Sequence, residues 1–394
     1  MENCQSLIPV NSRPAARGQG LPQPDLFAPI KGLDEIATDP LVDQALRDGA
    51  WVEFSLSGGK DCGAVSALTM LYLDSIGHPR EKRFALHADL GRAEWKSTPA
   101  QVQAQADALG VPLVVVRATD DLVSRFENRW ERGCNDYADL LLYNLRGPWS
   151  SPSLKFCQSE KKIQVMGPYL ARTYKGETII QVVGIRREES SGRKHTPVAK
   201  LDTRFAKVGN RAGTRMILWH PGVELRTAEV FAANDRHGIP LAEGYALGAT
   251  RWSCAYCVMS SEGDLTISAS VDGNHDLYRH YVGMEVQSTF SFQAGRWLAD
   301  IAPQLLDAST IAAVNQAKLY SADRRRMEAS MPARHRYIDG WPLHLPTHEE
   351  AREIAAVRAV LLERHQLRNY YATGVAVRDR FAELLELKAQ KLAA

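Results

Sequence analysis

One short segment constrains the fold of this chain most: residues 52–63 have the sequence Val-Glu-Phe-Ser-Leu-Ser-Gly-Gly-Lys-Asp-Cys-Gly. Its apolar start ends in Ser-Gly-Gly-Lys-Asp, and a helical pattern follows directly. The two glycines allow a tight turn and a close approach of a ligand to the backbone. The N–H groups of such a turn, with the positive end of the next helix, form an anion site, most often for phosphate. The segment therefore predicts a strand, a phosphate-binding loop and a helix.

Strand and helix patterns alternate from residue 51 to residue 238. Strands are predicted at 51–56, 83–90, 112–117, 178–185 and 215–219, and helices at 40–48, 61–76, 97–109, 120–131, 159–174 and 227–237. The alternation predicts right-handed βαβ units and an α/β fold, an open, mostly parallel five-stranded sheet with helices on both faces. The continuous apolar run at 112–117 indicates a buried strand. Ligands of such sheets bind beyond the carboxyl ends of the strands, where Ser57, Asp89 and Arg186 lie.

The chain has 394 residues, too many for one ordinary core. We expect a disordered segment at 1–30, a nucleotide-binding domain at 31–275 and a helical region at 276–394. Helices in the last region are expected at 292–306, 311–331, 348–366 and 375–392. No apolar run approaches the ~20 residues that span a bilayer, and the N-terminal segment lacks an apolar signal region. The expectation is a cytoplasmic protein without a membrane partner.

Positive charge is concentrated between residues 151 and 215, where 14 Lys and Arg stand against 5 Asp and Glu. Such a stretch suits a polyphosphate, a sulfate or a nucleic-acid backbone. A solvated basic surface is the simpler explanation of the charge excess alone. Residues 190–210 within it are expected to form a polar loop.

Five segments, in order, resemble motifs of the PP-loop ATP-pyrophosphatase and phosphoadenosine-phosphosulfate (PAPS) reductase superfamily. They are Ser-Gly-Gly-Lys-Asp at 57–61, His-Ala-Asp-Leu-Gly at 87–91, Phe-Cys-Gln-Ser-Glu-Lys-Lys at 156–162, Gly-Ile-Arg-Arg-Glu-Glu-Ser-Ser-Gly-Arg at 184–193, and Tyr-Ala-Leu-Gly-Ala-Thr-Arg-Trp-Ser-Cys-Ala-Tyr-Cys at 245–257. The resemblance covers roughly residues 50–260 and implies ATP and Mg²⁺ as ligands.

The resemblance implies a nucleotide site made of Ser55, Ser57, Gly58, Gly59, Lys60, Asp61, Cys62, Asp89, Lys162 and Gly184. It implies catalytic roles for Lys60, Asp61, Arg186 and Arg193. A carboxylate at a helix start, such as Asp61, is favoured by the dipole and could hold Mg²⁺ through water. The arginines offer planar forks for phosphate or sulfate oxygens, or else pair with Glu188 and Glu189 at the surface. Asp89 could reach a ribose hydroxyl or the metal, or only cap its strand.

The chain has six cysteines. Cys62 stands where the family's loop usually has serine, either as a thiol of lowered pKa at a helix start or as a small residue filling the same space. Cys254 and Cys257 form a C-x-x-C pair, half of a tetrahedral site, to which Cys157 and Cys134 could add two ligands. Four thiolates suit Zn²⁺ or an iron–sulfur cluster such as [4Fe–4S]. Two reduced cysteines packed in a turn remain the alternative.

The resemblance implies an enzyme that binds ATP, splits the bond between the α- and β-phosphates and adenylates an acceptor. The chain resembles the sulfur-insertion branch of the superfamily more than the true sulfonucleotide reductases. Those reductases use a cysteine near the C-terminus, and no cysteine follows Cys257 here. Sulfur transfer to nucleic acid or to a small molecule would then draw on a sulfur donor such as a cysteine desulfurase. Two alternatives stay open: a thiol-dependent reductase of PAPS or adenosine phosphosulfate, and a non-catalytic nucleotide or nucleic-acid binding module of a mobile-element or defence system.

Overall fold

The computed structural model describes residues 35–393, which fall into two compact units. The first unit combines the residues up to Leu122 with Lys155–Asn274, and the second combines Val123–Leu154 with the residues from His275 onward. Residues 123–154, which the expected division places in the nucleotide-binding domain, group in the structure with the residues from His275 onward. The segment expected to be disordered, 1–30, lies outside the described residues.

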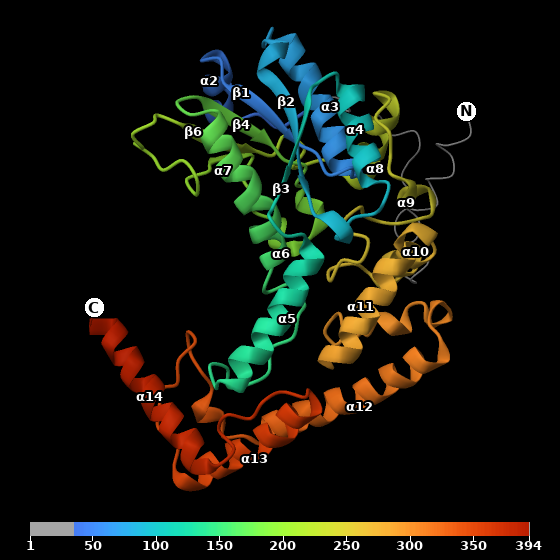
Figure 1. Cartoon of the computed structure of the whole chain (residues 1–394). Coiled ribbons are helices and arrows are strands. Elements are labelled where there is room, and N and C mark those ends of the chain that lie inside the picture. Colours follow the sequence, from blue (N-terminus) through green and yellow to red (C-terminus); the bar gives the residue numbers. More distant parts are fainter. Residues whose placement is uncertain (1–34, 394) are drawn as a thin grey trace. The chain divides into compact units, whose positions relative to one another are not determined.

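The first unit is built on a six-stranded sheet (Figure 1). Its strands follow the order β3 (Leu113–Arg117), β2 (Arg83–Asp89), β1 (Trp51–Ser55), β4 (Thr178–Val182), β6 (Arg215–Trp219) and β5 (Ala199–Leu201). All neighbours are parallel except β5, which runs antiparallel to β6. The open, mostly parallel α/β sheet is confirmed, but the predicted number of five strands was wrong. The sixth strand, β5, has only three residues with Lys200 at its centre, too short to show a period of two.

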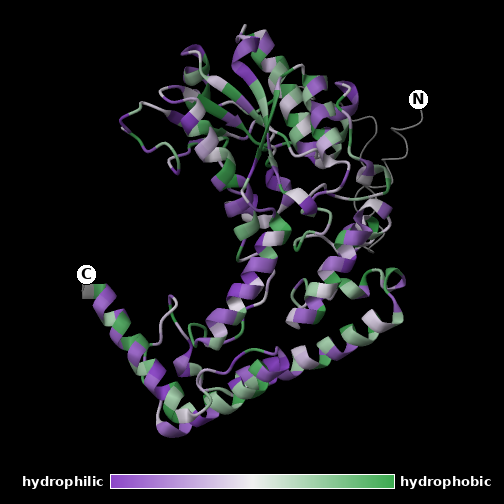
Figure 2. Ribbon diagram, viewed as in Figure 1, coloured by the Kyte–Doolittle hydropathy of each residue, from purple (hydrophilic) through white to green (hydrophobic). Residues whose placement is uncertain are grey.

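Alternating side chains give this sheet two apolar faces. One face, which includes Val52 and Phe54, packs against α2 (Pro40–Arg47), α3 (Lys60–Ser75), α4 (Thr98–Leu109) and α8 (Thr227–Arg236). The other, which includes Phe84 and Ile179, packs against α7 (Gln164–Thr173). Figure 2 shows the strands as predominantly hydrophobic segments between these helices. The sheet is therefore buried between two helical layers, as βαβ connections require.

Strand β3 differs from the expectation of a buried strand because it lies at the edge of the sheet. Val114 and Val116 pack partly against the α7 face, whereas Val115 is 53% exposed. An apolar run indicates a strand, but its position in the sheet depends on pairings that the run does not encode.

The second unit is helical, as expected. Its long helices are α5 (Leu122–Ala138), α11 (His275–Ser288), α12 (Ala308–Ser330), α13 (His348–Arg364) and α14 (Gly374–Ala393). Helix α13 begins at a capping box in which Thr347 and Glu350 bond each other's backbone N–H groups, and it packs against α14 through Ile354 and Phe381. Within residues 35–393, no helix is both long and apolar enough to cross a membrane.

The prediction of a helix at residues 292–306 was wrong. This segment forms only two short 3₁₀ turns, Leu298–Asp300 and Pro303–Leu305. The cause is the buried Glu285, whose carboxylate accepts the N–H groups of Phe292 (2.7 Å), Leu298 (2.8 Å) and Ala299 (3.1 Å). The backbone therefore wraps around a carboxylate instead of bonding to itself. Burial raises the pKa of Glu285 to about 7, against the opposing effect of the three N–H donors.

Candidate functional site

The phosphate-binding loop predicted from the sequence connects β1 to α3. Gly58 adopts φ +77°, and a Cβ there would lie 3.1 Å from both Gln101 and Trp252, so glycine is required by conformation and by space. Gly59 is the N-cap residue of α3 and has no side chain to cap it. The N–H of Lys60, the first amide of α3, is instead capped by the Tyr245 hydroxyl (3.0 Å), and the positive end of the helix dipole lies at the loop.

Three charged side chains form an ionic core at the start of α3. Lys60 Nζ donates to Asp61 Oδ2 at 2.8 Å, and Arg186 Nε donates to Asp61 Oδ1 at 2.6 Å. Lys60 and Arg186 are buried, and only 18% of the Asp61 side chain is exposed. Burial alone would raise the pKa of Asp61, but the charges and hydrogen bonds of Lys60 and Arg186 outweigh it and hold this pKa below its ordinary value. Asp61 is therefore ionised at neutral pH.

Further positive charge surrounds this core. Arg186 Nη1 also donates to Glu188 (2.7 Å), and Arg193 pairs with Glu189. Both arginines therefore form the surface ion pairs that the sequence offers as the alternative to phosphate binding. The pKa of Arg193 is lowered by burial and then by the charge of Arg251, while the charge of Asp61 raises it. Arg193 thus lies within electrostatic range of Asp61 and Arg186 in the ionic core, and Arg251 lies within range of Arg193. Arg251 was absent from the predicted site although it belongs to the fifth motif.

Residues distant in sequence hold Lys60 in place. Its backbone N–H donates to the Tyr245 hydroxyl (3.0 Å), and its carbonyl accepts from Asn234 Nδ2 (2.8 Å). Its ammonium group reaches the Thr250 carbonyl (3.4 Å) and lies 5.5 Å from the Tyr245 ring centre. Tyr245 is in α9 (Glu243–Ala246), and Thr250 is fixed in turn by Asp264 in α10 (Glu262–Ala269). Tyr245 opens the fifth motif, which is the one signal of these contacts that the motifs contain.

Cys62 and Gly184 pack against the backbone of the phosphate-binding loop. The Cys62 thiol donates to the Gly59 carbonyl (3.1 Å) and accepts the Ser57 N–H (3.4 Å). Burial raises the pKa of this thiol, which opposes the lowering that a helix start can produce. Cys62 therefore braces the loop as a small protonated side chain. A Cβ on Gly184 would lie 2.8 Å from Cys62 N, so the chain after β4 rests directly on the backbone of the loop.

Other predicted residues are engaged by their own neighbours. Ser55 Oγ donates to the buried Glu53 (2.9 Å). Asp89 accepts the Gly91 N–H (2.6 Å) and the Arg117 Nε–H (2.9 Å), which is the capping role considered for it. An Asp89 contact to ribose or metal would require Arg117 to give up this bond.

Three of the four predicted cysteine ligands share one neighbourhood. Burial, and then the charges of Cys257 and Cys157, raise the pKa of Cys254 to about 12, against the lowering effect of Lys162. Cys157 lies on α6 (Phe156–Gln158), and Cys257 Sγ accepts the Met259 N–H at 3.4 Å. These thiols are of the right kind for zinc or an iron–sulfur cluster. In the part of the chain that the structure describes, however, no group of three or more His, Cys, Asp or Glu side chains is arranged to hold a metal ion.

Cys134, the fourth predicted ligand, belongs to the second unit. Its thiol is buried in a cluster with Trp130, Tyr137 and Leu361, and burial raises its pKa to about 12. This is the environment of a core residue. The metal site therefore remains a prediction.

The comparisons with known proteins agree with the motifs. A family model described as the phosphoadenosine phosphosulfate reductase domain matches residues 52–260, just over half of the chain. The match begins on β1, contains the ionic core and ends directly after the C-x-x-C pair. No curated protein matches the chain. From the loop, the ordered motifs and this match, the chain belongs to the phosphoadenosine phosphosulfate reductase domain family.

Proposed function

We propose that this protein binds ATP with Mg²⁺, splits the bond between the α- and β-phosphates and transfers AMP to an acceptor. The observation that carries the proposal is the ionic core of Lys60, Asp61 and Arg186 at the start of α3. Arg193 also lies within electrostatic range of Asp61, although its own carboxylate partner is Glu189. Lysine and arginine side chains gathered in this way are the cations that hold the phosphates of a nucleotide.

In the proposed reaction a nucleophile of the acceptor attacks the α-phosphorus, and the bond to the bridging oxygen breaks. The electron pair leaves with pyrophosphate. The Lys60 ammonium group and the positive end of the α3 dipole stabilise charge on the departing phosphates, and the forks of Arg186 and Arg193 orient the phosphate oxygens. Asp61, which is ionised, would hold the Mg²⁺ that accompanies ATP. The adenylated acceptor is then open to displacement by sulfur or nitrogen, which includes sulfur transfer to nucleic acid or to a small molecule.

Pyrophosphate release from ATP tests this proposal. The Lys60→Ala variant is expected to lose the activity, because the cation at the phosphate loop is removed. Lys207→Ala, an exposed lysine on the loop between β5 and β6, is the matched control and should keep it. Undiminished pyrophosphate release by Lys60→Ala would overturn the proposal.

A second candidate is a thiol-dependent sulfonucleotide reductase, favoured by the neighbourhood of Cys157, Cys254 and Lys162. A cysteine thiolate would attack the sulfate sulfur of PAPS, forming an S–S bond and releasing the nucleotide bisphosphate. A thiol donor would then attack the cysteine sulfur, releasing sulfite and leaving a disulfide. The raised pKa of Cys254 makes it a poor nucleophile, and Cys157, which is partly exposed, is the better candidate. Sulfite release from PAPS that Cys157→Ser abolishes would decide for this candidate.

A non-catalytic nucleotide or nucleic-acid binding module is the third candidate. It is supported by the exposed lysines and arginines of the 190–215 segment, such as Lys194, Lys200 and Arg211. Nucleotide or salt-sensitive DNA binding without turnover in either assay would favour it.

A further inference from the structure

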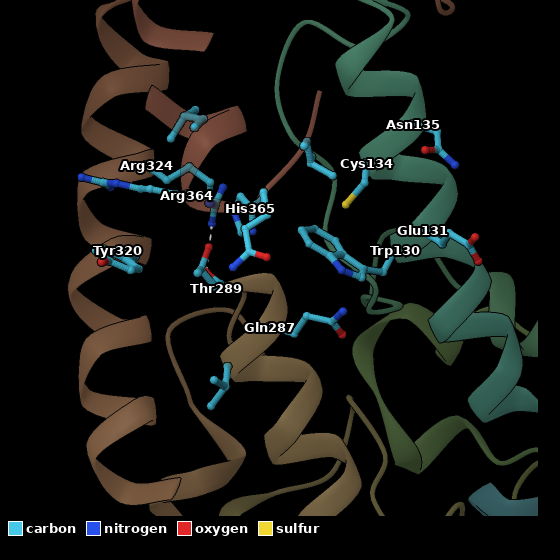
Figure 3. Close-up of a pocket in the computed structure, with 14 residues that line it drawn as sticks. Trp130, Glu131, Cys134, Asn135, Gln287, Thr289, Tyr320, Arg324, Arg364 and His365 are labelled. Atoms are coloured by element: carbon cyan, nitrogen blue, oxygen red, sulfur yellow. Dashed lines mark hydrogen bonds between the residues drawn. The ribbon is translucent and has the colours of Figure 1, made fainter. Parts of the chain in front are cut away.

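The second unit contains a pocket of about 500 Å³, separate in the chain from the phosphate loop (Figure 3). Its walls come from α5, the end of α11, α12 and the end of α13 with the turn that follows. A volume of this size is typical of sites that bury a small organic molecule. In Figure 3, Arg324, Arg364 and His365 lie close together, with Trp130 next to His365.

Two guanidinium groups dominate the lining. Arg324 is 5% exposed and stacks 3.5 Å from the Phe290 ring centre, and Arg364 stacks on Tyr320. Each already has one carboxylate partner: Arg324 Nη1 donates to Glu328 (3.2 Å), and Arg364 Nη2 donates to Asp323 (3.1 Å). Among the described residues, Arg324 Nε and Arg364 Nη1 are buried without a hydrogen-bond partner. Buried donors of this kind are uncommon, because they forgo the hydrogen bonds they would make in water.

The backbone at the pocket is strained. Thr289 and Gln366 both line it, and both adopt positive φ, +59° and +54°. Only four non-glycine residues of the described chain do so. Positive φ is a genuine outlier for a β-branched residue such as threonine, and such strain clusters at ligand sites. The hydroxyl of Thr289 is also buried without a partner in the described structure.

Histidine and tryptophan rings line the pocket beside the two arginines. The pKa of His365 is lowered to about 4 by burial, then by the charges of Arg324 and Arg364, so its imidazole is neutral at pH 7. Glu131, an exposed residue of α5, is the acidic side chain in the lining. The Trp130 ring meets His365 edge-on, with ring centres 5.3 Å apart. Gln287 adds an amide that can donate or accept a hydrogen bond.

We propose that this pocket binds a small phosphate-bearing aromatic anion, the chemistry of a nucleoside monophosphate. Arg324 and Arg364 would hold the phosphate, because guanidinium forks match its oxygens. The base would lie against Trp130, with Gln287 at its polar edge. This site goes beyond the proposed function, since it is formed entirely by the second unit.

The test uses the full chain carrying Lys60→Ala, so that the phosphate loop contributes little binding. AMP, inorganic phosphate and adenosine are titrated by calorimetry, and the His365 ring is followed by NMR, with His365→Gln to assign its signal. AMP should bind and raise the pKa of His365 above about 4, because a phosphate would face the imidazole. Adenosine should bind at least about tenfold more weakly than AMP.

Arg364→Gln should weaken AMP binding at least about tenfold, whereas Arg368→Gln, an exposed arginine outside the lining, should not. Equal AMP affinity in Arg364→Gln, or a His365 signal that neither AMP nor phosphate shifts, would overturn the proposal. Because the His365 signal is measured with the pocket intact, the test stands even where Arg364→Gln does not fold. Phosphate binding as tightly as AMP would overturn the nucleoside part. The His365 signal reports on this pocket alone. It therefore distinguishes a failure of this proposal from a failure of the phosphate loop to bind ATP.

Discussion

Arg186 Nε donates to Asp61 Oδ1 at 2.6 Å across a sequence separation of 125 residues. Arg186 follows β4, and Asp61 lies in the first turn of α3. The contact joins two adjacent strand ends of the sheet at the phosphate loop. Because Arg186 is 3% exposed and Asp61 also pairs with the buried Lys60, each charge depends on the others for its compensation.

Asp61→Asn should destabilise the first unit by about 3 kcal/mol at pH 7, because it leaves Lys60 and Arg186 buried without their carboxylate. The pKa of Asp61 in the folded protein is below its ordinary value of 3.8, so its stabilisation is present above that pH and is lost as the pH falls through the folded value. The difference in the free energy of unfolding between Asp61→Asn and wild type should therefore shrink below about pH 4. Urea unfolding at several pH values measures it, and a difference independent of pH would contradict this account.

Gly184→Ala should weaken ATP binding at least about tenfold, because its Cβ would press on the backbone at Asp61 and Cys62. Gly192→Ala is the matched control, since nothing lies within 4 Å of the position of its Cβ. Calorimetric titration with Mg·ATP compares the two. Equal affinities would show that the loop does not depend on this close packing.

The loop and most of the sheet could be predicted because their signals are local. Ser57 to Asp61 and the apolar runs each determine a conformation within a few residues. The remainder depends on contacts between distant segments: Lys60 is fixed by Tyr245, and the backbone after Phe292 is shaped by Glu285. The edge position of β3 and the assignment of 123–154 to the second unit have the same cause. Arg251 could have been found from its motif alone, whereas the pairing of Asp89 with Arg117 required the strand register.

The buried Glu53 should make the stability of the protein depend on pH. It is fully buried in β1, and burial raises its pKa to about 8, against the lowering effect of the Ser55 hydroxyl. The folded state therefore holds a proton that the unfolded state releases above about pH 4.5. Between these two pH values the stability contributed by protonated Glu53 falls as the pH rises, by up to about 1.4 kcal/mol per pH unit.

Glu53→Gln should remove this slope and raise the melting temperature at pH 8 relative to wild type. Glu243→Gln, a substitution of an exposed glutamate in α9, serves as the control. Melting curves from pH 5 to pH 9 measure the effect. Parallel curves for wild type and Glu53→Gln would contradict a protonated Glu53.

The predicted metal site is tested by metal analysis and visible absorption of anaerobically purified protein. We expect zinc or iron that is lost in Cys254→Ser and in Cys157→Ser, because these thiols share one neighbourhood with Cys257. Cys134→Ser should retain the metal, since its thiol is buried among apolar side chains of the second unit. Wild-type protein without zinc or iron would rule the site out.

The proposed function requires that the loop from Ser57 to Asp61 binds the phosphates of a nucleotide. Calorimetric titration of the full chain with Mg·ATP and with adenosine tests this claim. We expect ATP to bind at least about tenfold more tightly than adenosine, Lys60→Ala to lose that difference and Lys207→Ala to keep it. ATP binding that is equally tight in Lys60→Ala, or no tighter than that of adenosine in wild type, would contradict the claim.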